Sequence, residues 1–169
     1  MVEVELRFKA DEKILSLIER IGKLESHSEE LDKYYKFSED KTRKVVIRVR
    51  YKDGKEILTF KGSSVLKEDS AWQEWENKIS DSEDLIKLLL SNGFEELVVI
   101  KKLRKKFSYE DFEINFDNIE KLGCFVEIEL KGDNPEVLRK RIIDFAKDNF
   151  NILEDALIKK GYVKLMLNE

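Results

Sequence analysis

The sequence predicts an α+β domain of about eight antiparallel strands, with three or four helices between groups of strands. Three observations support this prediction. Several stretches alternate charged and apolar residues with a period of two, which is typical of strands with two unlike faces. The dipeptide Asp53-Gly54 suits a two-residue hairpin turn. Other stretches repeat apolar residues at helical spacing, which is typical of packing helices, and eight antiparallel strands can close into a barrel.

The first strand extends from Val2 to Lys9, where charge and hydrocarbon alternate without a break. One face carries Glu3, Glu5, Arg7 and Lys9, and the other carries Val2, Val4, Leu6 and Phe8. Asp11 then caps a helix whose apolar spacing continues as far as Leu24. A polar run, Ser26 to Glu30, leads to an aromatic-rich strand from Leu31 to Phe37. We expect His27, within the polar run, to lie on the surface.

The next two strands, Lys44 to Lys52 and Lys55 to Lys61, surround Asp53-Gly54. A type I′ turn there fixes the pairing of opposite residues. With Lys52 opposite Lys55, the pairs are Arg50 with Ile57, Arg48 with Thr59 and Val46 with Lys61. Arg48, Arg50 and Lys61 then share one face of the hairpin.

The middle of the chain continues the pattern. Gly62 to Ser70 is expected to be a loop, and Ala71 to Ile79 a strand that carries Glu74, Glu76 and Lys78 on one face. Ser80 and Glu83 resemble the capping box of a helix that ends at Gly93. Leu97 to Phe107 is a further strand, with Lys102, Arg104 and Lys106 on one face.

The last third contains two more strands and a helix. Phe112 to Asp117 and Gly123 to Lys131 alternate, and place Asp117, Glu127 and Glu129 among the charged positions. Asn134-Pro135 begins a helix. Ile152 to Met166 is expected to start as a helix.

Composition limits the class of protein. The 169 residues suit one domain spanning 1–169. Charged residues make up 40% of the chain, yet the net charge is only −4, which argues against a nucleic-acid or anionic-membrane binder. No apolar run is long enough to span a bilayer and no signal peptide is evident, so a cytoplasmic protein is expected. One Cys and one His exclude Cys-rich and His-rich zinc sites.

The charged faces allow two arrangements: either they face water, or helices cover the barrel and the charges line a wet tunnel. The tunnel acids would be Glu3, Glu5, Glu74, Glu76, Asp117, Glu127 and Glu129. The bases would be Arg7, Lys9, Arg48, Arg50, Lys61, Lys102 and Arg104. Clustered carboxylates suit Mg²⁺ or Mn²⁺, and clustered Arg and Lys suit phosphate oxygens. A metal-bound polyphosphate requires both.

Glu3-x-Glu5-x-Arg7 resembles the Glu-x-Glu-x-Lys motif of the CYTH superfamily, the triphosphate tunnel metalloenzymes that include class IV adenylyl cyclases and thiamine triphosphatases. The resemblance continues along almost the whole chain through Asp32-x-Tyr34-Tyr35, Ile47-Arg48-Val49-Arg50, Leu58-Thr59-Phe60-Lys61-Gly62, Glu74-x-Glu76, Lys102-x-Arg104, Asp117 and Gly123-Cys124-Phe125-Val126-Glu127-Ile128-Glu129. It implies an eight-stranded antiparallel barrel that forms a charged tunnel, with helices packed outside.

The resemblance also implies roles for individual residues. Metal would be held by Glu3, Glu5, Glu127 and Glu129, assisted by Asp117, Glu74 or Glu76. Triphosphate would be bound by Arg7, Arg48, Arg50, Lys61, Lys102 and Arg104, with Lys9 or Lys78 able to replace a missing contact. Glu3 and Glu5 are the candidate catalytic residues, which would orient the attacking water directly or through a metal ion.

Three positions depart from the family pattern. Arg7 replaces the motif lysine, and because a guanidinium does not lose its proton, phosphate binding is expected of it rather than general-base catalysis. Trp72 stands where an arginine is common, and Gly161-Tyr162 stands where a Ser-Tyr pair is common.

We therefore expect a metal-dependent triphosphatase that acts on a small-molecule triphosphate, inorganic or organic, as a monomer or homodimer. Two alternatives remain. One is an adenylyl cyclase that converts ATP to cyclic AMP and pyrophosphate, which additionally needs an adenosine pocket. The other is a non-catalytic module that binds polyphosphate. The full set of carboxylates favours an enzyme, since a simple anion binder would favour bases alone.

Overall fold

The computed structural model describes residues 2–41, 45–64 and 71–169. Its eight strands are β1 (Val2–Lys9), β2 (Lys23–Phe37), β3 (Val46–Lys52), β4 (Lys55–Ser64), β5 (Ala71–Ile79), β6 (Phe94–Tyr109), β7 (Phe112–Ile119) and β8 (Gly123–Gly132). Its helices are α1 (Glu12–Ile21), α2 (Ser82–Ser91), α3 (Pro135–Phe150) and α4 (Tyr162–Met166), with a 3-10 turn at Glu154–Ala156. The predicted α+β class is confirmed.

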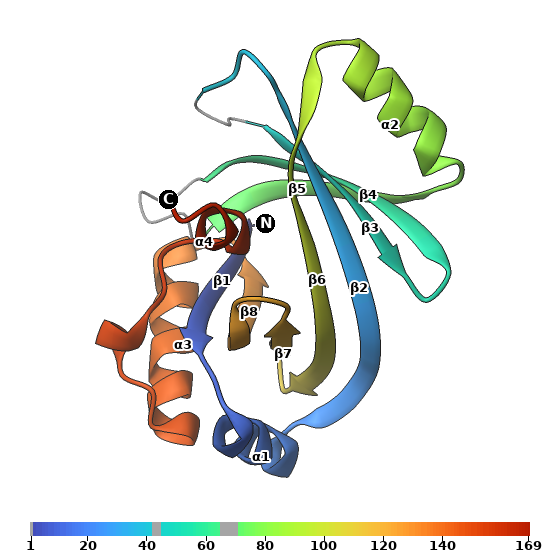
Figure 1. Cartoon of the computed structure of the whole chain (residues 1–169). Helices are drawn as coiled ribbons and strands as arrows, with labels where there is room; N and C mark the ends of the chain where they lie inside the picture. The colour runs from blue at the N-terminus through green and yellow to red at the C-terminus, as the bar shows by residue number, and fades with distance from the viewer. Residues whose placement is uncertain (1, 42–44, 65–70) are drawn as a thin grey trace.

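The strands close into an antiparallel barrel in the order β1-β5-β4-β3-β2-β6-β7-β8 (Figure 1). β1 pairs with β8 along its whole length, from Val2 opposite Gly132 to Lys9 opposite Phe125. On its other side β1 pairs with β5 only at Glu3 opposite Trp72 and Val4 opposite Ala71. The barrel is therefore joined firmly at one edge of β1 and narrowly at the other.

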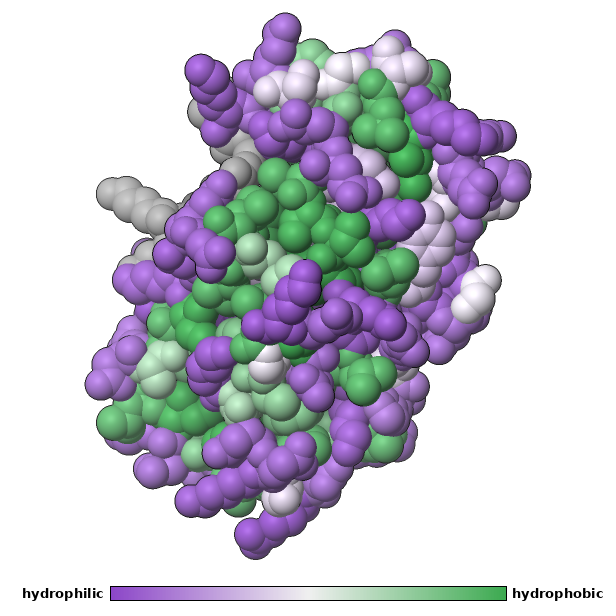
Figure 2. Space-filling model, viewed as in Figure 1, coloured by the Kyte–Doolittle hydropathy of each residue, from purple (hydrophilic) through white to green (hydrophobic). Residues whose placement is uncertain are grey.

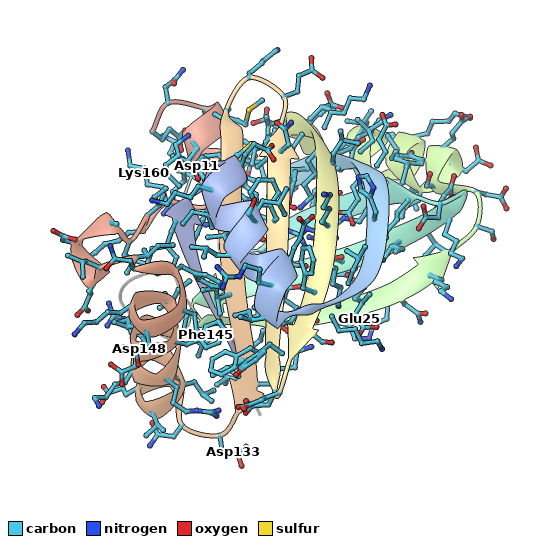
Figure 3. All side chains as sticks on the ribbon, turned by 90° about the horizontal axis from the view of Figure 1, so that it is seen from below. Asp11, Glu25, Asp133, Phe145, Asp148 and Lys160 are labelled. Atoms are coloured by element: carbon cyan, nitrogen blue, oxygen red, sulfur yellow. The ribbon has the colours of Figure 1, made fainter. Side chains whose placement is uncertain are left out.

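α1, α2 and α3 lie against the outside of the strands (Figure 1) and pack on their apolar faces, whereas the charged faces line the interior. Leu6 of β1 and Ile128 of β8 belong to one buried cluster with Ile18 of α1 and Ile142 of α3. In Figure 3, seen from below, Phe145 extends from α3 toward the strands. Its ring stacks on Phe112 with centroids 4.2 Å apart. The main core thus lies between barrel and helices.

A second apolar layer lies under α2. Ile47, Val49 and Leu58 of the β3–β4 hairpin are buried there, with Leu85 and Leu89 of α2 packed against them. Figure 2 shows the face viewed in Figure 1 as apolar patches divided by polar side chains. No helix in the described part of the chain is long and apolar enough to cross a membrane.

The hairpin register is confirmed in full. Asp53 and Gly54 both have positive φ, 50° and 68°, as a type I′ turn requires. Arg50 lies opposite Ile57, Arg48 opposite Thr59 and Val46 opposite Lys61. A two-residue turn leaves only one way for the following strand to return, so one dipeptide determined the pairing of the whole hairpin.

Four predicted boundaries differ from the structure. β2 begins at Lys23, so Leu24 and the polar run after it are strand and not helix or loop. Asp81, in left-handed conformation with φ 58°, precedes α2 without a side-chain cap, so the capping box at Ser80 does not form. The C-terminal stretch starts with only a 3-10 turn, at Glu154–Ala156, and its α-helix, α4, lies at its end. β4 also continues to Ser64, and the rest of the predicted loop, 65–70, lies outside the described residues.

Candidate functional site

A cavity of about 970 Å³ lies against the charged faces of the strands. The residues that line it include twelve of the fourteen predicted site residues: Glu3, Glu5, Arg7, Arg48, Arg50, Lys61, Glu74, Glu76, Lys102, Arg104, Glu127 and Glu129. Gly161 and Tyr162, at the start of α4, also line it. The structure therefore shows the arrangement with inward charges and outer helices.

Three carboxylates come together on one wall of this cavity. Glu5, Glu127 and Glu129 each offer an oxygen, and these oxygens lie within 4.8 Å of one another. The register of β1 against β8 explains the meeting, because Glu5 lies directly opposite Glu129 and Arg7 opposite Glu127. Antiparallel partners on the same face have close side chains. We call these three residues the carboxylate triad.

The three carboxylates of the triad differ in the direction in which their pKa values are shifted. Burial and the negative charge of Glu127 raise the pKa of Glu5 to about 7. Burial, Glu5 and Glu113 raise the pKa of Glu129 well above its usual range. Burial also opposes ionisation of Glu127, but the adjacent guanidiniums of Arg7 and Arg104 outweigh it and hold the pKa of Glu127 low. One carboxylate thus keeps its charge while two tend to retain protons.

Arg7 is the counter-ion of this triad. Its Nε donates to Glu127 Oε1 at 2.8 Å, and its Nη2 donates to both Glu5 and Glu127. Its Nη1 donates to the backbone oxygen of Lys160 at 3.1 Å, and the guanidinium lies 4.1 Å from the ring centroid of Tyr162. Arg7 therefore lines the cavity with its donors already directed at protein acceptors.

Two other arginines are held in matching forks by buried aspartates. Arg50 donates to Asp32 from Nε at 2.7 Å and from Nη2 at 2.8 Å. Arg104 donates to Asp117 from Nε at 2.6 Å and from Nη2 at 2.5 Å. Lys102 lies 3.3 Å from Asp117. Such forks fix the plane and position of each guanidinium.

Asp117 therefore occupies a different place from that expected of a metal-assisting residue. It is fully buried and is absent from the cavity lining. Its Oδ1 accepts a hydrogen bond from Arg104, and its Oδ2 accepts from Arg104 and Lys102. The strand pairing explains these contacts, because Asp117 lies directly opposite Arg104 in the pairing of β6 with β7. The structure makes Asp117 an anchor for cations.

The three remaining predicted acids do not belong to the triad, and each of them also pairs with a cation. Glu76 accepts from Arg48 at 3.0 Å and from Thr59 at 3.0 Å. Glu3 forms an ion pair with Lys131 at 2.9 Å, and Glu74 forms one with Lys61. The structure brings Glu3, Glu74 and Glu76 into the cavity but not into the triad.

Lys9 does not line the cavity. Its Nζ donates to the backbone oxygen of Leu122 at 2.8 Å and lies 4.0 Å from the ring centroid of Phe125. Lys9 is exposed at the end of β1, one repeat beyond the last cavity residue of that strand. The strict alternation placed it on the correct face but could not show where the cavity ends. The structure also leaves Lys78, the other candidate replacement, out of the lining.

Sequence reasoning missed several cavity residues. Glu30 is wholly buried and pairs with Lys52 at 3.0 Å and with Arg50 at 3.3 Å. These cations outweigh its burial and lower its pKa to about 2. Asn115 also lines the cavity and donates to Glu129 at 2.9 Å. A signal for Glu30 existed, since Ser28, Glu30, Asp32 and Tyr34 continue the two-residue period through the polar run.

The triad suits a hard divalent cation. Carboxylate and amide oxygens are the donors that Mg²⁺ and Mn²⁺ prefer. Asn115 Oδ1 is buried and has no hydrogen-bond partner within the described residues, which leaves an oxygen acceptor free beside the triad. A bound cation would also favour the ionised forms of Glu5 and Glu129. Glu5, Glu127 and Glu129 are therefore the residues that could hold metal.

Comparison with known proteins gives consistent matches. A family model described as the CYTH domain matches residues 1–162. A Methanocaldococcus jannaschii protein named "putative adenylate cyclase" is 30% identical over 98% of each chain. The solved structure of the PH1012 protein from Pyrococcus horikoshii has a TM-score of 0.87 at 29% identity, over 96% of this chain and 98% of that one.

A Hippeastrum protein gives a more distant match. Its solved structure is described as an adenylyl cyclase candidate with a dominant triphosphatase activity. The TM-score is 0.69 at 15% identity, over 98% of this chain and 93% of that one. At this identity the likeness is one of fold.

Proposed function

This chain belongs to the CYTH family, and we propose that it is a metal-dependent triphosphatase that removes phosphate from inorganic triphosphate or an organic triphosphate. The observation that carries the proposal is that acidic and basic side chains lie on different walls of the cavity. The carboxylate triad lies on the wall formed by β1 and β8, and a set of arginines and lysines comes from β3, β4 and β6. A chain of phosphates with its metal ion has the complementary arrangement of charge, with a cation for the carboxylates and anions for the arginines and lysines.

Glu5, Glu127 and Glu129 would hold Mg²⁺ or Mn²⁺. The bound ion would supply Lewis-acid polarisation of phosphate oxygens. Glu5 belongs to the triad and lines the cavity, so its carboxylate would lie next to both the ion and the substrate. Glu5 is accordingly our candidate for orienting the attacking water, with Glu3 on the same face of β1.

The cations would bind and orient the phosphates. Arg50 and Arg104 are fixed by their aspartate forks, and Lys102 lies near both Asp117 and Glu30, 3.3 and 3.6 Å away. Fixed positive charge is favourable where negative charge accumulates on the transferring phosphoryl group, because no reorganisation is needed during the reaction. Arg48 and Lys61, held by Glu76 and Glu74, would extend the binding surface along the hairpin.

Adenylyl cyclisation is the second candidate, and the name of the M. jannaschii relative favours it. In this reaction the ribose 3′-hydroxyl attacks the α-phosphate and pyrophosphate leaves. Tyr34, Val46 and Val163 belong to one apolar cluster and also line the cavity, and this part of it could accept a nucleoside.

Phosphorus NMR separates the two reactions. The chain is incubated with triphosphate or with ATP, in the presence of Mg²⁺ or Mn²⁺. Orthophosphate as the first product supports the triphosphatase, and pyrophosphate with cyclic AMP supports the cyclase. Glu5→Gln should abolish either product, whereas Glu120→Gln, an exposed carboxylate outside the cavity, should not. No turnover of either substrate by the unaltered chain would reject both proposals.

A further inference from the structure

β5 is hydrogen-bonded to a neighbouring strand on only one side along most of its length. β4 pairs with it as far as Glu56 opposite Ile79, but β1 reaches only Ala71 and Trp72. Beyond Trp72 the other edge of β5 has no strand partner among the described residues. Every residue from Glu74 to Lys78 is exposed. An unpaired row of backbone N–H and C=O groups of this kind can pair with another strand.

The opposite edge of the same sheet is covered. The pairing of β6 with β7 begins at Lys102, so the part of β6 from Phe94 to Ile100 also has no strand partner on that side among the described residues. There, however, Leu97 and Val98 of β6 and Leu165 and Met166 of α4 pack against the same buried cluster. In the described part of the chain, a helix thus packs beside this edge, whereas the β5 edge is open.

Charges on the open edge restrict what can pair with it. Glu76 and Lys78 lie on the cavity face of β5, while Trp75 lies on the outer face beside Phe60, with ring centroids 5.8 Å apart. A strand of unmatched charge would be repelled, because like charges directly opposite one another are destabilising. A strand with the complementary order of charges is needed.

We propose that the partner is a second copy of this chain, paired antiparallel through β5 about a two-fold axis at Asn77. In this register Glu76 lies opposite Lys78 of the partner subunit, and the symmetry forms that pair twice. Trp75 lies opposite Ile79 of the partner subunit, also twice, on the outer face. Both the charges and the apolar side chains of the edge are then matched.

Neighbouring registers are less favourable. An axis at Glu76 places two glutamates opposite each other at the centre. An axis at Trp75 places Glu74 opposite Glu76 of the partner subunit twice. Only the axis at Asn77 pairs every charge with its opposite between Trp75 and Ile79. Because Glu76 lines the cavity, Lys78 of the partner subunit would lie on the cavity face next to it, so each copy adds a cation beside the site of the other.

Analytical ultracentrifugation of the full chain tests the interface. The unaltered chain should be a dimer. Lys78→Glu should weaken dimerisation by about tenfold or more, because two attractive pairs become repulsive. Lys55→Glu is the matched control, since Lys55 is exposed at the far end of the neighbouring strand β4, and it should leave the dimer intact.

A mixing experiment then tests the register. Glu76→Lys alone should also be monomeric, but an equal mixture of Glu76→Lys and Lys78→Glu chains should form a mixed dimer, because every opposed pair is again attractive. As a test that does not depend on Glu76, Asn77→Cys in a Cys124→Ser background should form an intermolecular disulfide, and Lys55→Cys should not. A monomeric unaltered chain, a dimer insensitive to Lys78→Glu, or no cross-link through Asn77→Cys would each overturn the proposal.

Discussion

The buried carboxylate of Asp32 accepts two hydrogen bonds from Arg50, at 2.7 Å from Nε and at 2.8 Å from Nη2. Asp111 and Arg141 also form an ion pair with two hydrogen bonds, on the surface, in which Nη1 donates at 2.9 Å and Nη2 at 2.8 Å. The two pairs differ in burial, since Asp32 is 1% exposed and the Asp111 side chain 55%. They therefore allow the effect of burial on one kind of ion pair to be measured.

Asp32→Asn should lower the free energy of unfolding by about 3 kcal/mol, because it leaves the buried Arg50 guanidinium facing a neutral amide. Asp111→Asn should cost less than about 1 kcal/mol, because water screens the exposed pair. Urea unfolding of both variants measures the difference. Equal losses would show that burial does not determine the strength of these pairs. If Arg50 binds phosphate, Asp32→Asn should also raise KM for triphosphate more than it lowers kcat.

Metal affinity should rise with pH through neutrality. The pKa of Glu5 is raised to about 7, so below that pH a proton competes with the cation for the triad. The proton displaced from Glu5 alone predicts about tenfold tighter binding at pH 8 than at pH 6, and the proton retained by Glu129 would make the dependence steeper. Titration calorimetry with Mn²⁺ at both values, in buffers of different ionisation enthalpy, measures affinity and proton release together. An affinity independent of pH would contradict the protonated state of the triad.

Glu129→Gln should stabilise the metal-free chain in alkaline solution. Burial and neighbouring carboxylates raise the folded pKa of Glu129 above its unfolded value, so its stabilising contribution is complete at low pH and is lost as the pH rises through the folded pKa. Removing the carboxylate should raise the free energy of unfolding at pH 8 by on the order of 1 kcal/mol and change it little at pH 4. Thermal unfolding at the two values tests this, with Glu120→Gln expected to show no such dependence. The same Glu129→Gln variant should lose the Mn²⁺ binding seen by calorimetry.

Removing the hydroxyl of Tyr162 and removing that of Tyr51 should change the free energy of unfolding in opposite directions. The Tyr162 hydroxyl is buried and has no hydrogen-bond partner among the described residues, so Tyr162→Phe should stabilise the chain by about 1 kcal/mol. The Tyr51 hydroxyl lies 2.9 Å from the buried Ser82 hydroxyl, so Tyr51→Phe should destabilise it by a similar amount. Thermal unfolding compares the two. A destabilised Tyr162→Phe would mean that this hydroxyl has a partner in solution.

The sequence was most informative where a local rule acts over a whole element. Asp53-Gly54 determined the register of β3 against β4, and the two-residue period placed Arg48 and Arg50 on the charged face. Asn134 likewise caps α3 through a hydrogen bond to the backbone nitrogen of Val137. In these cases the backbone geometry follows from one or two residues, and tertiary contacts do not override it.

Predictions from the sequence failed where the usual contrast between apolar core and polar surface is reversed. Glu30 is wholly buried, yet a run of serines and acids is typical of an exposed loop. Its tertiary partners, which include Lys52, Arg50 and Lys102, make its burial tolerable. The position of Lys9 beyond the cavity depended in the same way on where the barrel ends, which alternation cannot indicate. The division of the acids into a triad and cation anchors required the pairing of β6 with β7 and of β1 with β8.

The pairing of Glu5 with Glu129 also has a consequence for how the chain matures. The two residues lie far apart in the sequence, in β1 and β8, so β1 must wait until β8 has been made before the two can meet. Contacts that are so distant in sequence are slow to form. The metal-binding wall is therefore assembled late in folding, and a partly made chain cannot carry it.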